Sequence, residues 1–341
     1  MSAPLDRAVI LAGGGGTRLW PWAGPRLPKP LLPLGGGGRT LLAATLERLQ
    51  GLVPAGALAV QAAPELVRAL AAGEPRLAGA ALRDEPAARD TGPAVALAMR
   101  RALREEPGAV VAVLPADHRI DDVAAYRAAM ARAAGLARGG RLVVLGVRPD
   151  GPDTRFGYVE LGPPLGDGAH EVARFTEKPA PDLARRFVAG GRHLWNAGMF
   201  VWRADAFWTA LERHAPELAA AVAEAEAGNA AAWERTPRTS IDYALMERAA
   251  GVAAVPLDAG WDDVGGWAAV LRLVARGDAG PARLVPARGE HGPGTVVLDV
   301  TGDVPQDAAV VVCERPILLV RGPHGLLVVP RDEPDRVKSF V

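Results

Sequence analysis

Cysteine is almost absent from this chain of 341 residues, which contains Cys313 alone. A single cysteine excludes an intramolecular disulfide and any zinc or iron–sulfur site that needs several cysteines. Net charge is absent too, because 39 basic residues balance 39 acidic residues. This balance argues against a basic nucleic-acid platform and against an acidic adaptor, so we expect no nucleic-acid partner.

Long apolar runs are also missing. The chain has no stretch of about 18 apolar residues, and its start, MSAPLDRAVILAGGGG, lacks the basic region and cleavage site of a signal peptide. With 49% hydrophobic residues the chain is still too apolar for a disordered protein, and its length suits one large α/β domain with an appendage. These features predict a cytoplasmic protein without a membrane partner.

Lysine and asparagine are scarce as well. Lys29, Lys178 and Lys338 are the only lysines, and Asn196 and Asn229 are the only asparagines. We attribute this scarcity to a genome-wide bias toward arginine, alanine, glycine and proline. A lysine or asparagine that persists against such a bias carries more weight as a candidate functional residue.

Short apolar runs alternate with helical patterns over residues 1–150. The runs predict buried strands at 8–12, 57–61, 109–114 and 142–147, and apolar residues at three- and four-residue spacing predict helices at 40–50, 64–72, 93–104 and 122–138. Such alternation predicts right-handed βαβ crossovers and a mostly parallel sheet with helices on both faces. Ligands of such sheets collect at the carboxyl ends of the strands.

The middle of the chain continues this pattern, whereas the end does not. Residues 151–272 contain further predicted strands (FGYVEL, EVARFTE, GMFVW) and helices at 204–214, 216–228 and 240–250. After residue 275 the runs TVVLDV, AAVVVC, PILLV and GLLVV are interrupted by glycine, proline and aspartate, which predicts a small all-β appendage. We therefore expect a Rossmann-like α/β domain with a mixed, mostly parallel sheet at residues 1–274, and a β domain at residues 275–341.

A glycine-rich turn follows the first predicted strand, in the segment LAGGGGTRLWPWAGPRLPKP of residues 11–30. Glycines at such a turn let backbone N–H groups approach an anion. The segment is not a Walker A loop, because no Gly-Lys-Ser/Thr follows, and Arg18 replaces the third glycine of a dinucleotide-binding fingerprint. Arg18 and the proline-flanked Lys29 suit a polyphosphate. The alternative is a flexible turn beside two solvated cations.

Eight motifs along the chain carry a family resemblance. In order they are GGGGTRLWP…PKP, RDEPAARDTGPAVALA (83–98), LPADH (114–118), FGYVE (156–160), FTEKP (175–179), WNAGMF (195–200), SIDYALME (240–247) and WDDVGGW (261–267). Over the whole chain this series resembles the mannose-1-phosphate guanylyltransferases of the sugar-1-phosphate nucleotidylyltransferase superfamily. The sequence departs from their pattern at Ala23-Gly24, where Ser-Arg is usual, and at Asp90, where asparagine is usual. Whether Arg26 replaces the missing arginine is left open.

The resemblance implies a fold and a reaction. The fold is the nucleotidyltransferase fold, similar to that of GT-A enzymes, and the C-terminal residues resemble a truncated left-handed β-helix, which implies a homodimer. The reaction is transfer of GMP from GTP to α-D-mannose 1-phosphate, with GDP-mannose and pyrophosphate as products and Mg²⁺ or another divalent cation as cofactor. The chain length implies the short, monofunctional type, without a cupin-type isomerase domain.

The resemblance also implies roles for individual residues. It assigns Arg18, Lys29 and Lys178 to catalysis, and Gly157, Glu177, Lys178 and Asn196 to the sugar phosphate. It assigns Leu11, Ala12, Gly13, Gly14, Gly16, Thr17, Glu85 and Thr91 to the nucleotide. Glu85 aligns with the base-reading position, where a carboxylate suits guanine because it accepts both the N1–H and the 2-amino group. Without the resemblance, Glu85 would be interpreted as a solvated loop carboxylate.

Two aspartates are the candidate metal ligands. Asp117 follows the apolar run 109–114, so we expect it at the carboxyl end of a strand beside the glycine-rich turn. The resemblance aligns Asp263, in WDDVGGW, with the second metal-binding aspartate, and carboxylate oxygens are ligands that Mg²⁺ prefers. Without the resemblance, either aspartate would be interpreted as a turn residue or a helix cap.

Two alternatives to this function are left open. In the first, the acceptor is another sugar 1-phosphate, such as a glucose or heptose phosphate. In the second, the chain is a catalytically silent regulatory homologue that senses nucleotide sugars. A silent homologue would be expected to lose a catalytic or metal-binding residue, and this chain retains all of them; only the change to Ala23-Gly24 favours the second alternative.

Overall fold

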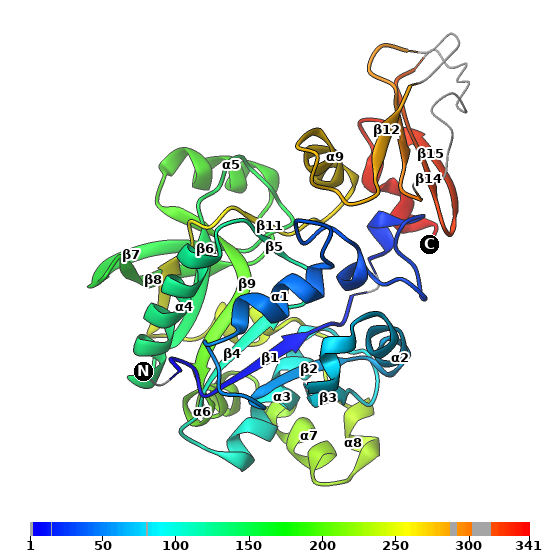
Figure 1. Ribbon diagram of the computed structural model, residues 1–341. Coiled ribbons are helices and arrows are strands. Elements are labelled where there is room, and N and C mark those ends of the chain that lie inside the picture. Colours follow the sequence, from blue (N-terminus) through cyan, green and yellow to red (C-terminus); the bar gives the residue numbers. More distant parts are fainter. Residues whose placement is uncertain (1–2, 15, 80, 287–291, 302–314) are drawn as a thin grey trace.

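A nine-stranded sheet forms the centre of the protein (Figure 1), whose computed structural model describes residues 3–14, 16–79, 81–286, 292–301 and 315–341. The strand order is β3-β2-β1-β4-β9-β6-β10-β8-β7. The strands are β1 Arg7–Leu11, β2 Leu58–Ala62, β3 Ala81–Asp84, β4 Val110–Pro115, β6 Leu142–Val147, β7 Tyr158–Gly166, β8 Ala169–Thr176, β9 His193–Arg203 and β10 Val252–Pro256.

Parallel pairing dominates one half of this sheet. Strand β1 pairs in parallel with β2 and β4, β2 pairs in parallel with β3, and β6 pairs in parallel with β10. Strand β9 is antiparallel to both β4 and β6, which makes the sheet mixed. The prediction of a mixed, mostly parallel sheet is confirmed, and the strands predicted at 8–12, 57–61, 109–114 and 142–147 correspond to β1, β2, β4 and β6.

Helices cover both faces of the sheet, and alternate strand residues serve the two faces. In β1, Ala8 and Ile10 pack into the core beneath one set of helices, while Val9 packs into the core beneath the other. The first set is α1 Leu41–Leu49, α2 Pro64–Gly73 and α4 Val123–Arg138; the second is α3 Thr91–Glu105, α6 Ala204–His214, α7 Pro216–Glu226 and α8 Ala230–Glu234. Burial on both faces explains why the central strands are continuous apolar runs rather than alternating patterns.

The helix expected at residues 240–250 is much shorter in the structure. A π-helical turn at Asp242–Met246 replaces it, in which the N–H of Glu247 donates to the carbonyl of Asp242 at 3.0 Å. Such wide turns shift the side chains that follow out of the ordinary helical register and are frequent at functional sites. This turn places Asp242 at the wall of a pocket that is lined by residues from the ends of β1 and β4.

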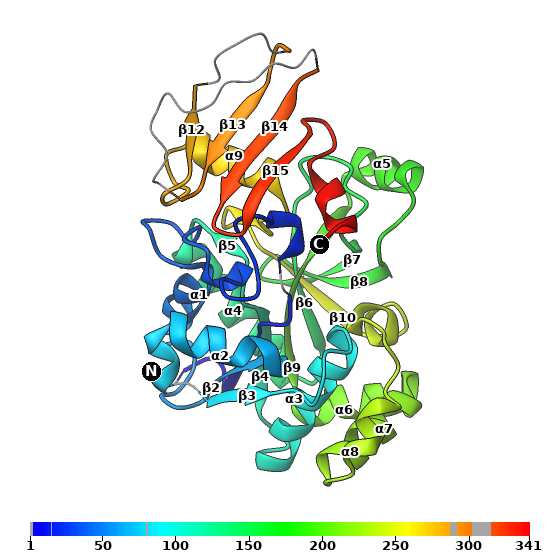
Figure 2. The ribbon, with the colours of Figure 1, turned by 90° about the vertical axis from the view of Figure 1, so that its right-hand side faces the viewer.

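A second, small sheet forms the C-terminal appendage (Figure 2). Its strands are β12 Arg283–Val285, β13 Val296–Asp299, β14 Ile317–Gly322 and β15 Gly325–Pro330. The expected all-β character is confirmed, but the rungs of a left-handed β-helix stack in parallel, and here only β13 and β14 are parallel. In the described residues the appendage is a small mixed sheet with one parallel pair. The expected strand AAVVVC (308–313) lies outside them, so the truncated β-helix stays a prediction.

The appendage shares a hydrophobic core with the segment that follows the glycine-rich turn. We call this cluster the loop–appendage core; it includes Leu19, Trp22, Leu32, Trp267, Val270, Leu298, Val320 and Val337. Trp22 of the loop segment stacks on Trp267 of α9 (Trp267–Ala275), with ring centroids 6.5 Å apart. The fold of the loop segment therefore depends on side chains more than 200 residues away in the sequence.

None of the helices in the described part of the chain is long and apolar enough to cross a membrane.

Truncation of Leu298 tests the loop–appendage core. Leu298 is 0% exposed, whereas its cross-strand neighbour Leu284 is 56% exposed. We expect Leu298→Ala to lower the free energy of unfolding by about 2–5 kcal/mol, because it leaves a cavity in a packed core. Leu284→Ala is the matched control, with a change within about 0.5 kcal/mol. Urea unfolding measures both, and equal losses would contradict the packing described here.

Candidate active site

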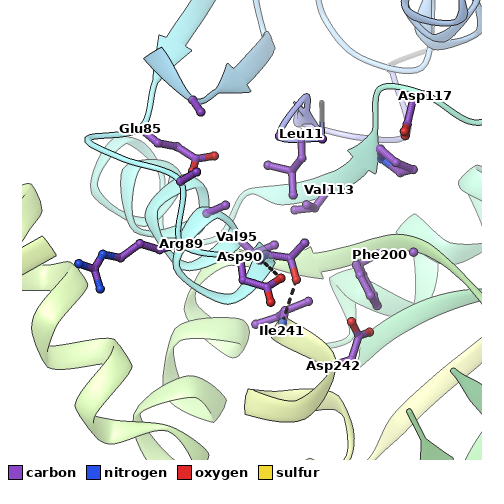
Figure 3. Close-up of a pocket in the computed structure, with 18 of the residues that line it drawn as sticks. Leu11, Glu85, Arg89, Asp90, Val95, Val113, Asp117, Phe200, Ile241 and Asp242 are labelled. Atoms are coloured by element: carbon purple, nitrogen blue, oxygen red, sulfur yellow. Dashed lines mark hydrogen bonds between the residues drawn. The ribbon is translucent and has the colours of Figure 1, made fainter. Parts of the chain in front are cut away.

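A pocket with a volume of about 420 Å³ lies at the carboxyl ends of β3, β1 and β4 (Figure 3). Of the residues that the sequence predicts for the site, it is lined by Leu11, Gly13, Gly14, Glu85, Thr91 and Asp117. Ala88, Arg89, Asp90, Val113, His118, Phe200, Ile241 and Asp242 also line it. This is the edge at which parallel sheets bind ligands, as the sequence predicts.

The glycine-rich turn leaves β1 and passes directly over Lys29. Gly16 has a φ of +69°, and a Cβ on it would lie 2.6 Å from the Cβ of Lys29, so both the conformation and the close approach require glycine. Thr17 and the half-buried Arg18 follow on the short 3-10 helix Thr17–Leu19. The N–H of Ala12 donates to the carbonyl of Gln61 at 2.8 Å, so it already has a partner within the protein.

Lys29 connects the two predicted metal ligands. Its Nζ donates to Asp117 Oδ2 at 2.8 Å and to the carbonyl oxygen of Asp263 at 2.6 Å. The residue is only 8% exposed, and prolines on both sides restrict its backbone. Burial raises the pKa of the Asp117 carboxyl, but the adjacent ammonium group outweighs burial and the pKa lies below its usual value. Asp117 is therefore ionised at neutral pH.

A short β-ladder explains why Asp117 and Asp263 meet. Strand β5 (Arg119–Ile120) begins two residues after Asp117, and β11 (Trp261–Asp262) ends directly before Asp263. The two strands pair antiparallel, with Trp261 opposite Ile120. Burial raises the pKa of Asp263, and the positive charges of Lys29 and Arg155 oppose this effect.

The oxygen ligands at this point suit a magnesium ion. Asp117 and Asp263 supply carboxylates, and no group of three or more His, Cys, Asp or Glu side chains with metal-binding geometry exists among the described residues. Mg²⁺ is commonly held by one or two carboxylates together with substrate phosphates, so two carboxylates are sufficient. Asp117 and Asp263 therefore fit such an ion as its protein ligands.

His118 stands beside Asp117 as a neutral side chain. Burial lowers the pKa of its imidazole to about 4. Trp261 Nε1 donates to His118 Nδ1 at 3.1 Å, and because an indole only donates, the proton of His118 is on Nε2. The buried Arg48 donates to the backbone carbonyl of His118 at 3.0 Å. Both contacts fix the backbone that carries Asp117.

Glu85 lies in the pocket and not in solvent, which excludes a solvated loop carboxylate. It follows β3 directly, is 4% exposed, and accepts a hydrogen bond of 3.4 Å from Gln61 Nε2. Burial raises the pKa of the Glu85 carboxyl, and the hydrogen bond from Gln61 partly opposes this. Gln61 Nε2 also donates to the carbonyl of Ala94 at 2.7 Å, which fixes its amide in place.

Asp90, labelled in Figure 3, and Thr91 form a wall of the pocket at the start of α3. Asp90 adopts a φ of +73°, and its Oδ1 accepts the N–H of Thr91 at 2.6 Å at the start of α3. With an extended ψ of 176°, this positive φ lies outside the αL region, in a conformation that residues other than glycine rarely adopt. Thr91 Oγ1 accepts the N–H of Ile241 at 3.1 Å and so joins this wall to the π-helical turn.

The residues predicted for the sugar phosphate gather around Asp242. Asn196 Nδ2 donates to Asp242 Oδ1 at 2.8 Å, and Lys178 Nζ lies 3.0 Å from Glu177 Oε1. Burial and the neighbouring Glu177 raise the pKa of Asp242 to about 7. Sequence analysis quotes the motif that contains Asp242 but gives this residue no role, because nothing in the motif shows that its carboxyl is buried beside another one.

The carboxylate of Glu177 has a free oxygen. Its Oε2 is buried and makes no hydrogen bond among the described residues. A Cβ on Gly157 would lie 2.4 Å from this oxygen, so the glycine makes room for the carboxylate. Burial raises the pKa of Glu177, and the ion pair with Lys178 opposes this effect. A buried acceptor without a donor is a site at which a ligand hydroxyl or N–H would be stabilised.

Ala23 and Gly24, which form one of the departures from the family pattern, lie in the loop–appendage core and at its edge. Ala23 is buried in that core. A Cβ on Gly24 would lie 2.6 Å from the ring of His324, in the turn between β14 and β15, so the appendage occupies the space that a side chain would need there. Arg26 is exposed to solvent.

Comparison with known proteins places this chain in a family. The model of the nucleotidyl transferase family matches residues 7–276. Mannose-1-phosphate guanylyltransferase of Escherichia coli K12 is 37% identical over 78% of this chain and 59% of its own length. Xanthan biosynthesis protein XanB of Xanthomonas campestris pv. campestris is 39% identical over 80% of this chain and 60% of its own length. The chain thus spans less than two thirds of the length of these two relatives.

A solved structure matches the chain from end to end. It is the crystal structure of a Thermus thermophilus protein described as a mannose-1-phosphate geranyltransferase. The two chains are 34% identical, superpose with a TM-score of 0.82, and are each covered to 98%. With a family match over most of its length and a pocket at the expected edge of the sheet, this chain belongs to the nucleotidyl transferase family.

Proposed function

We propose that this protein transfers GMP from GTP to α-D-mannose 1-phosphate, which gives GDP-mannose and pyrophosphate. The observation that carries the proposal is the buried carboxylate of Glu85 in the same pocket as Asp117. The two residues follow β3 and β4, which are three strand positions apart, or about 14 Å. That span suits a nucleoside triphosphate with its base at Glu85 and its phosphates at Asp117.

Guanine is the base that Glu85 suits. Its N1–H and 2-amino group are adjacent donors, and an ionised carboxylate accepts both. Uracil and thymine present one ring N–H on that edge and adenine presents none, so these bases would leave a buried carboxylate oxygen unpaired. An unpaired buried acceptor costs about 1–3 kcal/mol, which is enough for selection.

The transfer itself is an in-line displacement. A phosphate oxygen of mannose 1-phosphate attacks the α-phosphorus of GTP, and the new O–P bond forms as the bond from that phosphorus to the bridging oxygen breaks. Pyrophosphate leaves with the electron pair of the broken bond. The attacking monoester is ionised at neutral pH, so no general base is needed. Lys29, Arg18 and Lys178 neutralise charge that accumulates on the phosphate oxygens.

Nucleotidyl transferases of this family generally use a divalent metal ion. We propose Mg²⁺, with Asp117 and Asp263 as its protein ligands. When bound, the ion would neutralise phosphate charge and orient the reacting groups. Lys29 would then release the oxygens that it holds in the free protein and become available to a phosphate.

We propose that the acceptor sugar binds at Glu177 and Asn196. Glu177 Oε2 is a buried acceptor with no partner among the described residues, and a sugar hydroxyl would donate to it. The proposal of mannose in particular is supported by the E. coli relative, whose name is mannose-1-phosphate guanylyltransferase.

Substrate crossing tests the proposed reaction directly. Pyrophosphate release is measured with Mg²⁺ for GTP, ATP, UTP and dTTP, each with mannose 1-phosphate and with glucose 1-phosphate. We expect release with GTP and mannose 1-phosphate, because only guanine satisfies Glu85. Release with another substrate pair would support nucleotidyl transfer but contradict the proposed substrates. If folded protein binds GDP-mannose but releases no pyrophosphate with any pair, the result would favour a silent regulatory homologue.

Removal of the Lys29 charge tests its catalytic role. We expect Lys29→Met to lower kcat by roughly 10²–10³-fold, comparable to the loss of other preorganised charge-stabilising groups. Asp117→Asn is expected to abolish turnover, because it removes both a metal ligand and the partner of Lys29. The exposed Lys338→Met is the matched control and should leave kcat unchanged. Near-normal turnover in folded Lys29→Met would contradict the assignment.

The pH dependence of GTP binding tests Glu85. Burial raises its pKa, so the carboxyl takes up a proton at a higher pH than an exposed glutamate would. We expect KM for GTP to rise as the pH falls through this raised pKa, since the protonated carboxyl no longer accepts two N–H groups. Glu85→Gln should show a higher KM without that rise, whereas the exposed Glu106→Gln should behave as wild type. An unchanged KM in Glu85→Gln would exclude Glu85 as the base reader.

A further inference from the structure

Arg155 is a cation that neither the family resemblance nor the sequence motifs assign to the active site. It lies in the loop between β6 and β7, next to Phe156, and its guanidinium stacks 5.4 Å from the centroid of that ring. The loop is fixed by Tyr158, whose buried hydroxyl accepts the N–H of Asp153 at 3.1 Å and donates to its carbonyl at 3.0 Å. Arg155 therefore projects from a rigid segment.

The hydrogen bonds of the guanidinium leave one nitrogen available. Arg155 Nε lies 3.1 Å from both carboxylate oxygens of Asp153, and Nη2 donates to Asp153 Oδ2 at 2.6 Å. Among the described residues, Nη1 makes no hydrogen bond; it lies 4.0 Å from Asp335 Oδ2. Because Asp153 holds the other two nitrogens, the direction of Nη1 is set by the protein.

Nη1 faces the proposed metal ligand Asp263. A Cβ on Gly265 would lie 3.0 Å from Arg155 Nη1 and 2.4 Å from Asp263 Oδ2, so both groups border the space that Gly265 leaves open. The positive charge of Arg155 also opposes the rise in the pKa of Asp263. A phosphate that occupies the Asp263 site would come within reach of a free pair of N–H donors.

Asp335 approaches the guanidinium from the C-terminal segment. It lies on the 3-10 helix Pro334–Ser339, which is anchored by the buried Val337 in the loop–appendage core. A Cβ on Gly266 would lie 2.4 Å from Asp335 Oδ1, so this glycine admits the carboxylate beside the start of α9. Asp153 and Asp335 thus flank Arg155 from two distant parts of the chain.

We propose that Arg155 is a further phosphate-binding residue of this active site and that Asp335 positions it. The inference rests on the proposed function. Several phosphates and two carboxylates must share the site, so it needs positive charge. The segment after the glycine-rich turn has Ala23-Gly24 where the family that this sequence resembles has Ser-Arg. Arg155 supplies an arginine to the same site from another loop, with Nη1 as the donor to a phosphate oxygen. The phosphate belongs either to the nucleotide or to the sugar 1-phosphate.

Binding measurements on variants test this role. Dissociation constants for pyrophosphate, GTP and mannose 1-phosphate are measured separately by calorimetry for wild type, Arg155→Met and Arg155→Lys. We expect Arg155→Met to weaken the binding of its phosphate ligand by about 10- to 100-fold. Weaker binding of pyrophosphate and GTP would assign Arg155 to the nucleotide, and weaker binding of mannose 1-phosphate would assign it to the sugar phosphate. Arg155→Lys should recover part of the loss, because it restores charge without the fork of donors.

Asp335→Asn and two controls separate positioning from stability. We expect Asp335→Asn to weaken the same ligand as Arg155→Met, by a smaller factor, and to leave the thermal midpoint near that of wild type, because an exposed ion pair contributes little. Glu333→Gln is the first control; Glu333 precedes the same 3-10 helix and pairs with Arg336. Arg185→Met is the second; Arg185 pairs with Asp182 on the exposed face of α5 (Pro181–Gly190). Both variants should bind all three ligands as wild type does.

The outcomes distinguish this inference from the proposed function. If Arg155→Met and Arg155→Lys bind all three ligands within twofold of wild type, Arg155 has a structural role only and the inference is wrong. If Asp335→Asn alone is without effect, the positioning role of Asp335 is wrong. Turnover of GTP with mannose 1-phosphate is measured on wild type in parallel; its absence would overturn the proposed function, while pyrophosphate binding still reports on Arg155.

Discussion

The ammonium group of Lys29 is the contact on which the geometry of the site depends. Two loops that carry carboxylates, one after β4 and one after β11, would repel each other if they met without a cation. Lys29 donates to the carboxylate of Asp117 at 2.8 Å and to the backbone carbonyl of Asp263 at 2.6 Å, and so joins the two loops. Its position in turn requires the absent side chain of Gly16, because a Cβ there would lie against its own.

The segment that carries Lys29 is held from outside the main sheet. Between Gly16 and Lys29 the chain has little regular structure, so its backbone is fixed by packing and not by a ladder of hydrogen bonds. Trp22 stacks on Trp267, and the β14–β15 turn is joined to the same segment by the N–H of His324, which donates to the carbonyl of Pro21 at 3.1 Å. The appendage is thus part of the structure that fixes the glycine-rich turn, although none of its described strands belongs to the main sheet.

The parts of this structure that could be predicted are those in which local pattern and burial agree. The runs at 8–12 and 109–114 read as buried strands because both of their faces are covered, and residues 122–138 read as a helix because one face is apolar. Strand β3 was not predicted because ALRD is short and polar, and the helix expected at 240–250 failed because a π-turn depends on tertiary contacts. Sequence motifs predict Glu85 and Asp117 as site residues. Arg155 and Asp335 are 180 residues apart in the sequence and approach each other only in the folded chain, so no motif could predict them.

The shared core between the loop segment and the appendage has a consequence for heat inactivation. Proteins open locally in cooperative units, and the small sheet has far fewer buried side chains than the nine-stranded one. Since Trp22 and Leu32 pack in the same hydrophobic core as the small sheet, its melting would release the glycine-rich turn while the large sheet remains folded. Activity would then be lost at the temperature at which the small sheet melts. The secondary structure that remains at that temperature would overstate the fraction of active molecules.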